Sequence, residues 1–355
     1  MLSKQPKNTK FMKEGSYGCV YKPGLKCDGT SYGPNSKIIS KIIKKQPRSE
    51  KEPEIGQILK TRLPYYDRYF SPAVDSCKIE LSKIKKTERQ KCKLFHQPNH
   101  DPDPEPPEYI SMKMTYVGKN TFGEILDIHY EKSPQSFWDY LKDTYEYLLC
   151  ALEELETLKL VHYDIKENNI LYSDSKKVPI LIDFGSSFQI SELYSESNLR
   201  TIFPVIPHNS LKSHRPLNTF QNIYWPRCLD VYCITTIIHG SPDLNWEKKR
   251  VNIERLQEQV NFFFDNHPMV QMTFQMISPT PQRNVSRYKQ KWLRYVDSWK
   301  GKSGKTVVNE LLNRWNTWDL YSVNIMYLGF IYKYRLYKNP EHMSFLVNLA
   351  DQLWG

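Results

Sequence analysis

Four polar side chains stand at spacings that suit the transfer of a phosphoryl group. The segment His162–Asn169 (HYDIKENN) carries the carboxylate of Asp164, the ammonium of Lys166 two residues on and the amide of Asn169 five residues on. Such a set can orient a hydroxyl group, steady a phosphate and bind a metal ion, in that order. Asp183 follows an apolar run and precedes Phe-Gly, a position suited to a carboxylate ligand of Mg²⁺. Each residue alone fits a turn or a surface charge, whereas the ordered set indicates a phosphoryl-transfer centre.

A short glycine-containing segment lies near the start of the chain. Gly15 and Gly18 flank Ser16 and Tyr17 between two predicted strands. Glycines at this spacing let the backbone approach phosphate oxygens and point its N–H groups at them. Alone, the pattern is a weak indication of a nucleotide site.

Lys41 lies on the next predicted strand, Lys37–Ile43 (KIISKII). A lysine in an apolar strand is usually solvated, but an inward ammonium would hold phosphates and pair with a carboxylate. We take Glu54 on the following predicted helix as that partner, with Glu50 and Glu52 as the competing candidates.

The elements around these residues change character along the chain. Glycine-punctuated, β-branched segments over 11–45 and at 109–117 predict strands, and residues 50–60 predict a short helix. From Ser136 apolar residues recur at three- and four-residue steps, and 240–355 is mostly helical in pattern. We therefore expect an α+β chain: a small strand-rich part at 8–116, with a loop insertion at about 83–108, and a larger helical part at 117–355.

Composition excludes several classes of protein. The 355 residues are 39% hydrophobic and 13% aromatic, so a wholly disordered chain is ruled out, and with 14 glycines a collagen-like one is too. We expect no membrane-spanning helix and no secretory signal, because no apolar stretch is long enough. The seven cysteines are scattered, which predicts free thiols in a reducing intracellular compartment. The net charge of +11 suits an anionic partner or a solvated basic surface.

Together these motifs carry a family resemblance. The order H-x-D-x-K-x-x-N at His162–Asn169, followed by D-F-G at Asp183–Gly185, resembles the eukaryotic protein-kinase family. The likeness covers roughly residues 11–190. It implies a two-lobed protein-kinase-like fold acting as one domain over 1–355, with Asp164 and Lys166 as catalytic residues and Asn169 and Asp183 as metal ligands. Lys166 resembles the serine/threonine kinases rather than the tyrosine kinases.

The resemblance also implies a nucleotide site. ATP would bind with Mg²⁺, for which Mn²⁺ could substitute, and protein Ser or Thr hydroxyls would accept its phosphoryl group. Met114–Val117 falls where the family has its gatekeeper and hinge. The residues expected against the nucleotide are Gly15, Ser16, Gly18, Val20, Lys41, Glu54, Met114 and Tyr116.

Several positions depart from the family pattern. Lys13 stands where the family has the first glycine of its loop, and Tyr163 replaces the arginine that precedes the catalytic aspartate. That arginine normally pairs with a phosphorylated activation loop, so its absence predicts activity without loop phosphorylation. The A-P-E motif is not recognisable, with Pro216–Asn218 and the stretch from Trp225-Pro226 through Asp230 as candidates.

The buried aspartate of the central helix of the large lobe has two candidates, Asp319 and Asp230. If Asp319 is right, a segment of about 233–317 is inserted or divergent, and the role of 186–317 in the substrate groove is open.

The segment Gly15–Pro23 (GSYGCVYKP) and the expected insertions at about 83–108 and 233–317 most resemble the divergent kinases of large cytoplasmic DNA viruses. This implies action in host cytoplasm or in the virus particle. The rival class is a pseudokinase acting as a scaffold, favoured by Lys13 and the absent A-P-E motif, and opposed by the intact catalytic set.

Two other sites were weighed. Cys77, Cys92, His96 and His100 could bind zinc, but their spacing is not that of a zinc knuckle. The basic N-terminus, with 13 Lys/Arg against 5 Asp/Glu over residues 1–60, leaves a nucleic-acid role open. We favour protein substrates over both.

Overall fold

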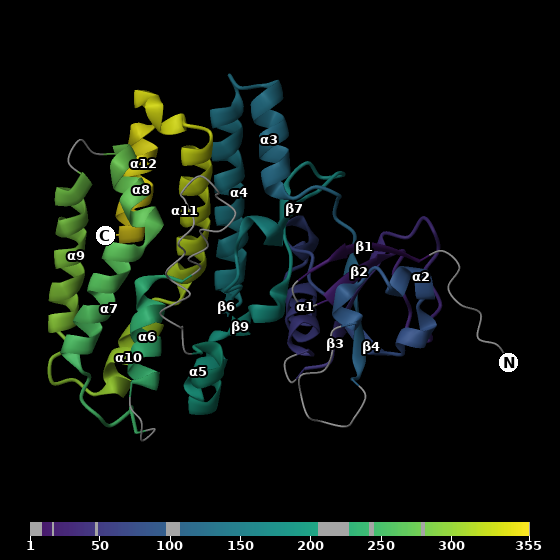
Figure 1. Ribbon diagram of the computed structural model, residues 1–355, viewed down its shortest axis with the longest axis horizontal. Helices are drawn as coiled ribbons and strands as arrows, with labels where there is room; N and C mark the ends of the chain where they lie inside the picture. The colour runs from purple at the N-terminus through teal and green to yellow at the C-terminus, as the bar shows by residue number, and fades with distance from the viewer. Residues whose placement is uncertain are drawn as a thin grey trace. The chain divides into compact units, whose positions relative to one another are not determined.

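The computed structural model describes residues 9–15, 18–46, 49–96, 107–204, 227–240, 245–277 and 281–354. They divide into two compact units (Figure 1). The first unit draws on 1–125 and 168–187, and the second on 126–167 and 188–355. Asn168–Ser187, which the sequence reading placed with the helical part, thus joins the strand-rich unit.

A five-stranded antiparallel sheet forms the centre of the first unit. Its order is β1-β2-β3-β5-β4. The strands are β1 (Lys10–Glu14), β2 (Gly18–Lys22), β3 (Ile38–Lys44), β4 (Asp75–Ile79) and β5 (Tyr109–Thr115).

The two faces of β3 carry separate apolar clusters. Because side chains alternate along a strand, Ile39 and Ile43 lie on the face that carries Lys41, and pack with Met112 and Met114 of β5. Ile42 lies on the opposite face, in a cluster that contains Cys19, Tyr21 and Cys92. The sheet is therefore covered on both faces, which explains why β3 is a nearly continuous apolar run.

Helix α1 (Lys51–Arg62) packs beside the sheet. Its acidic first turn and basic last turn complement the helix dipole. Gly56 is required by close packing, because a Cβ there would lie 1.8 Å from the carbonyl oxygen of Ala73. This close approach sets the distance between α1 and the chain that leads into β4.

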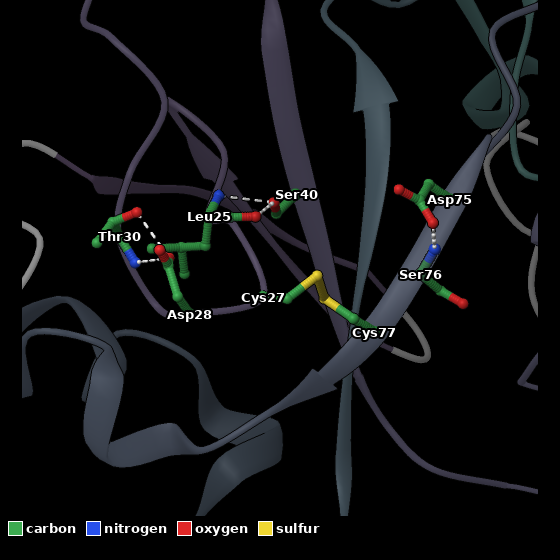
Figure 2. The surroundings of a disulfide bond; sticks show 8 residues. All are labelled: Leu25, Cys27, Asp28, Thr30, Ser40, Asp75, Ser76 and Cys77. Atoms are coloured by element: carbon green, nitrogen blue, oxygen red, sulfur yellow. Dashed lines mark hydrogen bonds between the residues drawn. A yellow bond between two sulfur atoms is a disulfide. The ribbon is translucent and has the colours of Figure 1, made fainter.

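Four of the seven cysteines form disulfides, which overturns the expectation of free thiols. Cys19 of β2 is bonded to Cys92, and Cys27 is bonded to Cys77 of β4. Figure 2 shows the second bridge, which ties the turn held by Asp28 and Thr30 to the edge of the sheet. Two disulfides do not fit a reducing compartment, so that expectation is wrong as well. The partners lie 73 and 50 residues apart, and only the folded sheet brings them together.

The insertion expected at about 83–108 is structured where it is described. It contains the short helix α2 (Lys86–Arg89), and Ile84 and Cys92 are buried against the sheet. The first disulfide anchors it, so its buried residues pack on one face of the sheet.

A hairpin of β7 (Ile170–Tyr172) and β8 (Pro179–Leu181) completes the first unit. The chain at Tyr69–Ser71 holds its end: the N–H of Leu181 donates to the carbonyl of Tyr69, and the N–H of Ser71 donates to that of Leu181. The residues that follow β8 are thereby fixed within this unit.

The second unit is almost entirely helical. Its helices are α4 (Phe137–Thr157), α5 (Glu196–Ile202), α6 (Leu229–His239), α7 (Ile253–Asn266), α8 (Pro268–Ile277), α9 (Pro281–Asp297), α10 (Gly304–Leu312), α11 (Asn316–Lys333) and α12 (Met343–Trp354); α3 (Phe122–Lys132) joins the two units. A two-stranded ladder of β6 (Leu160–Val161) and β9 (Phe188–Gln189) lies beside them.

Helix α11 is the buried centre of this unit, in contact with α4, α8 and α12 (Figure 1). Buried hydroxyl groups are satisfied across it: Tyr327 donates to Thr144, and Tyr145 donates to Asn324. Such pairing is the rule for polar groups in a core.

The structure confirms the α+β class, with a β-sheet region at the N-terminal side and a mostly helical remainder. In the part of the chain that the structure describes, no helix is long and apolar enough to cross a membrane.

Candidate active site

Lys41 lies at the middle of β3 and bridges two carboxylates. Its Nζ is 3.0 Å from Glu52 Oε2 and 2.7 Å from Asp183 Oδ1. Burial disfavours the ammonium, but the two carboxylates outweigh this effect and raise the pKa of Lys41. The side chain is therefore a fixed cation, held from α1 on one side and from the segment after β8 on the other.

The carboxylate partner on α1 is Glu52, and the expectation that Glu54 pairs with Lys41 is wrong. The side chain of Glu52 is 3% exposed, whereas that of Glu54 is 63% exposed and lies 3.9 Å from Lys51. Residues two apart point about 200° apart on a helix, so only one of them can face the sheet. Glu52 shares a face with the buried Ile55 and Leu59, three and seven residues on, and this helical spacing was the signal available in the sequence.

Only one oxygen of Glu52 is used in the pair. Glu52 Oε1 is buried without a hydrogen-bond partner among the described residues. Gly185 lies beside the cluster, since a Cβ there would be 3.6 Å from Asp183 Oδ1 and 3.9 Å from Glu52 Oε2. A glycine at 185 therefore leaves the space next to both carboxylates unfilled.

Asp183 occupies a backbone conformation that few residues adopt. Its φ is 65° and its ψ is 68°, in the left-handed region, where aspartate is tolerated better than most residues. Phe184, which follows, is fully buried with its ring edge-on to Phe70, at a centroid distance of 5.9 Å. This anchored ring holds the turn that aims Asp183 at Lys41.

Asn169 and Asp183 are neighbours through the backbone. The carbonyl of Asn169 accepts the N–H of Ile182, where β7 and β8 pair, and the side chain of Asn169 is buried. An amide and a carboxylate oxygen are ligands that Mg²⁺ prefers, and Mg²⁺ usually takes few protein ligands, the rest being phosphate and water oxygens. This donor set fits Mg²⁺. Within the described residues no group of three or more His, Cys, Asp or Glu is placed to hold a metal ion.

The glycine segment is partly described. The N–H of Gly15 donates to the carbonyl of Gly18 at 2.8 Å, which closes the turn between β1 and β2. A Cβ on Gly18 would lie 2.5 Å from Ile43 Cγ2 and 2.6 Å from the carbonyl oxygen of Ile42. Gly18 is thus needed for the packing of β2 on β3. Ser16 lies outside the described residues.

The remaining nucleotide-site candidates gather on one face of the sheet. Val20 is directly opposite Lys41 in the β2–β3 register, and both Val20 and Tyr116 pack against the cluster that contains Met114. The Nζ of Lys22 lies 3.1 Å from the centre of the Tyr116 ring, a cation–π contact. Val20, Met114 and Tyr116 thus form an apolar surface on the face of the sheet that carries Lys41.

The other two residues of the candidate catalytic set, Asp164 and Lys166, lie in the second unit. Lys166 Nζ is 2.7 Å from Asp164 Oδ2 and 2.9 Å from Oδ1, and both side chains are partly exposed. The N–H of Asp164 donates to Nδ1 of the buried His162 at 3.3 Å. The pair is therefore accessible but held on a fixed turn.

Asp319 of α11 fixes this turn. Its carboxylate accepts the N–H of His162 at 2.6 Å and that of Tyr163 at 2.9 Å. Burial outweighs these hydrogen bonds and raises the pKa of Asp319. Asp230, the other candidate, lies on α6 and forms an ion pair with Arg314 at 3.2 Å. The geometry therefore favours Asp319 as the central-helix aspartate. The candidate segments Pro216–Asn218 and Trp225-Pro226 lie outside the described residues.

Tyr163 is held by packing. Its φ is 64°, its ring lies edge-on to Phe188 and Phe203, and the Arg227 guanidinium is 4.9 Å from its centre. The Tyr163 hydroxyl and Arg227 Nη1 are buried and have no hydrogen-bond partner in the described parts of the chain. No spacing rule in the sequence would have predicted this edge-on packing.

The alternative zinc site is not formed. Cys77 and Cys92 are each bonded to another cysteine. His96 lies at the edge of the described residues and His100 lies beyond it.

A partial match to a curated protein kinase supports the resemblance to kinases. No family model matches the chain. A calcium/calmodulin-dependent protein kinase kinase of Caenorhabditis elegans is 42% identical over 81 residues, which cover 22% of this chain and 14% of that protein. Among solved structures, the PK-1 kinase of Cydia pomonella granulovirus matches with a TM-score of 0.31 and 18% identity, over 51% of each chain. The chain thus resembles protein kinases, over a small part of the length of its curated relative.

Proposed function

We propose that this chain is a protein kinase that transfers the γ-phosphoryl group of ATP to Ser or Thr hydroxyls of proteins. The observation that carries the proposal is the Lys41 bridge, in which β3, α1 and the Asp183 turn bring one ammonium against two carboxylates. A structural ion pair needs one partner. Here one lysine is held by two carboxylates, beside an apolar surface and beside Asn169 and Asp183, whose oxygens suit Mg²⁺. A fixed cation next to metal ligands is the arrangement that binds nucleotide phosphates together with Mg²⁺.

Each residue then has one task. Lys41 holds the α- and β-phosphates, and Glu52 keeps its ammonium in place. Asp183 and Asn169 would hold Mg²⁺, which would neutralise charge on the phosphates. Asp164 orients the substrate hydroxyl and accepts its proton, while Lys166 stabilises the charge on the phosphoryl group in flight. Asp319 acts on the chemistry only through the backbone of the turn it fixes.

Serine/threonine specificity rests on Lys166 and its contact with Asp164. An ammonium two residues after the catalytic aspartate lies beside the hydroxyl that the aspartate orients. The viral relationship and the location in host cytoplasm or virion are predictions from the sequence, and the two disulfides do not fit the first of these locations, because the cytosol is reducing.

The test is ³²P transfer from Mg·ATP to a generic basic protein and to the chain itself. Wild type is compared with Lys41→Met and with Lys44→Met, a matched control on the exposed end of β3. We expect label with wild type and Lys44→Met, loss of label with Lys41→Met in protein that circular dichroism shows to be folded, and phosphoserine or phosphothreonine in the product. ATP binding without any label in wild type would favour the pseudokinase, and phosphotyrosine would overturn the specificity.

A further inference from the structure

Lys13 departs from the family pattern and has no task in the proposed chemistry. It belongs to β1, which is an edge strand of the five-stranded sheet. Its side chain is exposed and forms no ion pair or hydrogen bond with the residues that the structure describes. What this ammonium can bind therefore depends on the face of the sheet to which it belongs.

A β-bulge determines that face. The pairing of β1 with β2 shifts by one residue between Phe11 and Lys13, so that Lys13 is opposite Val20. Without the shift, Lys13 would be opposite Cys19. Because directly opposed residues carry their side chains on the same face, the bulge moves Lys13 from the face of Cys19 to the face of Val20. Bulges beside active sites often re-aim a side chain in this way.

The face of Val20 is the one that carries Lys41. Val20 is opposite Lys41 in the β2–β3 register and packs against the apolar cluster of that face. Lys13, Val20 and Lys41 thus form one row across three neighbouring strands. Because neighbouring strands are about 4.8 Å apart, the Cα atoms of the two lysines are about 10 Å apart. Each lysine has a flexible four-carbon stem, so both ammonium groups can reach one polyphosphate chain.

The adjacent carboxylate does not neutralise Lys13. Glu14 is opposite Cys19 and so belongs to the other face, where its carboxylate accepts the N–H of Lys93 at 3.2 Å. Lys41, in contrast, is held by two carboxylates. In the described part of the chain, Lys13 is thus the member of the row whose charge no carboxylate balances.

An anion on this face is the partner that suits Lys13. The phosphates are the anionic groups of a nucleotide, whereas the base and the ribose are neutral. A lysine on an edge strand can also be a solvated residue that prevents pairing with other chains. A solvated lysine would serve that purpose on either face, so the bulge that turns Lys13 toward the face of Lys41 favours a bound anion.

We propose that Lys13 is a second phosphate-binding lysine of the nucleotide site and contacts the polyphosphate chain of ATP or ADP. The inference rests on the proposed function, because Lys41 is the residue expected against the phosphates. A glycine at this position would allow a close approach of the backbone. Lys13 supplies a positive charge instead, so this chain holds the nucleotide with one cation more than the family pattern provides.

The experiment measures the Kd of ATP, ADP and adenosine by isothermal titration calorimetry, on the full chain with Mg²⁺ present. The variants are Lys13→Gln, which removes the charge, and Lys13→Arg, which keeps it. Lys10→Gln is the matched control, because Lys10 is an exposed lysine of the same strand that is opposite Lys22 rather than Val20. The melting temperature of each variant checks that it is folded.

We expect Lys13→Gln to raise the Kd of ATP and of ADP about fivefold, as for the loss of one partly exposed charge pair. The Kd of adenosine should not change, because adenosine has no phosphate. Lys13→Arg should retain most of the affinity for ATP, and Lys10→Gln should bind ATP as the wild type does.

An unchanged Kd of ATP in Lys13→Gln, with a wild type that binds ATP, would overturn this inference and leave the proposed function standing. An equal loss in Lys10→Gln would show an effect of the overall charge, and an equal loss for adenosine would place Lys13 against the base or the ribose. Either result also overturns the inference. A wild-type chain that binds neither ATP nor ADP would contradict the proposed function itself, and this inference with it.

Discussion

Lys41 pairs with Glu52 across 3.0 Å, whereas Glu54, two residues further along α1, is 63% exposed. The rotation of α1 about its axis thus determines which of these two glutamates pairs with the lysine of the candidate nucleotide site. The two glutamates allow a controlled comparison, because both lie in the first turn of α1 but only Glu52 contacts Lys41.

Glu52→Gln should lower kcat/KM for ATP by about 10- to 100-fold, because it removes a charge-assisted hydrogen bond that holds the ammonium of Lys41. Glu54→Gln should leave kcat/KM within about twofold, since its side chain is solvated. Steady-state kinetics at varied ATP concentrations compares the two. Equal losses in both variants would mean that the effect comes from α1 as a whole rather than from the pair.

Asp230 gives the fold a specific dependence on pH. Burial, opposed by Arg314, raises its pKa from 3.8 to about 6. The folded state therefore binds the proton more tightly than the unfolded state, so Asp230 contributes stability below pH 4 that is lost as the pH rises to about 6. The unfolding free energy of Asp230→Asn minus that of wild type should accordingly grow between pH 4 and pH 6, by up to about 3 kcal/mol. Urea unfolding at several pH values measures this difference, and a flat profile would show that the pKa of Asp230 is the same in both states.

Because four of the seven cysteines are bonded, only three thiols should react in the unreduced chain. Maleimide modification of the denatured, unreduced chain should label three cysteines, Cys150, Cys228 and Cys233, and reduction should raise the count to seven. Mass spectrometry reads the count directly. Seven labels without reductant would mean that the chain is made with free thiols.

Reduction should also destabilise the first unit. The bridges close loops of 73 and 50 residues, for which the chain-entropy model gives about 4 kcal/mol each. Thermal unfolding with and without dithiothreitol tests this, and Cys150→Ser is the control, because Cys150 is outside both bridges. An unchanged melting transition would contradict a stabilising role.

Because Tyr163 stands where related kinases have an arginine, we expect kinase activity without phosphorylation of the activation loop. The half-buried ring contacts Phe188, Phe203 and the guanidinium of Arg227, and we expect this packing to hold the turn without a phosphate contact. Protein treated with a phosphatase, which is then removed, should retain the initial rate of untreated protein. Loss of activity that returns on autophosphorylation would show that a phosphate is needed after all.

The sequence was enough to propose those parts of the candidate site that depend on local order. Asp164, Lys166 and Asn169 fall within six consecutive residues, and Asp183 follows one short strand, so their spacing in the sequence was enough to propose them together. To predict Glu52, one had to know which face of α1 packs against the sheet. Three glutamates near the start of α1, Glu50, Glu52 and Glu54, made that face hard to identify.

The disulfides depended on information that is not local. Cys19 and Cys92 come together only because the segment after β4 folds back over the sheet, and no spacing rule encodes that return. A usable hint was present, since four of the seven cysteines fall in the first 92 residues. In the same way the contact of Asp319 with the turn at His162 spans 157 residues, so the sequence could offer only a choice between Asp319 and Asp230.

The most direct test of the proposed function is Asp164→Ala, with phosphoryl transfer and Mg·ATP binding measured on the same preparation. Asp164 orients the hydroxyl and does not hold the nucleotide in this account. We predict that turnover falls by about 100-fold or more, while the Kd of Mg·ATP measured by calorimetry stays within about threefold. Turnover equal to that of wild type would remove Asp164 from the chemistry and contradict the proposed catalytic site.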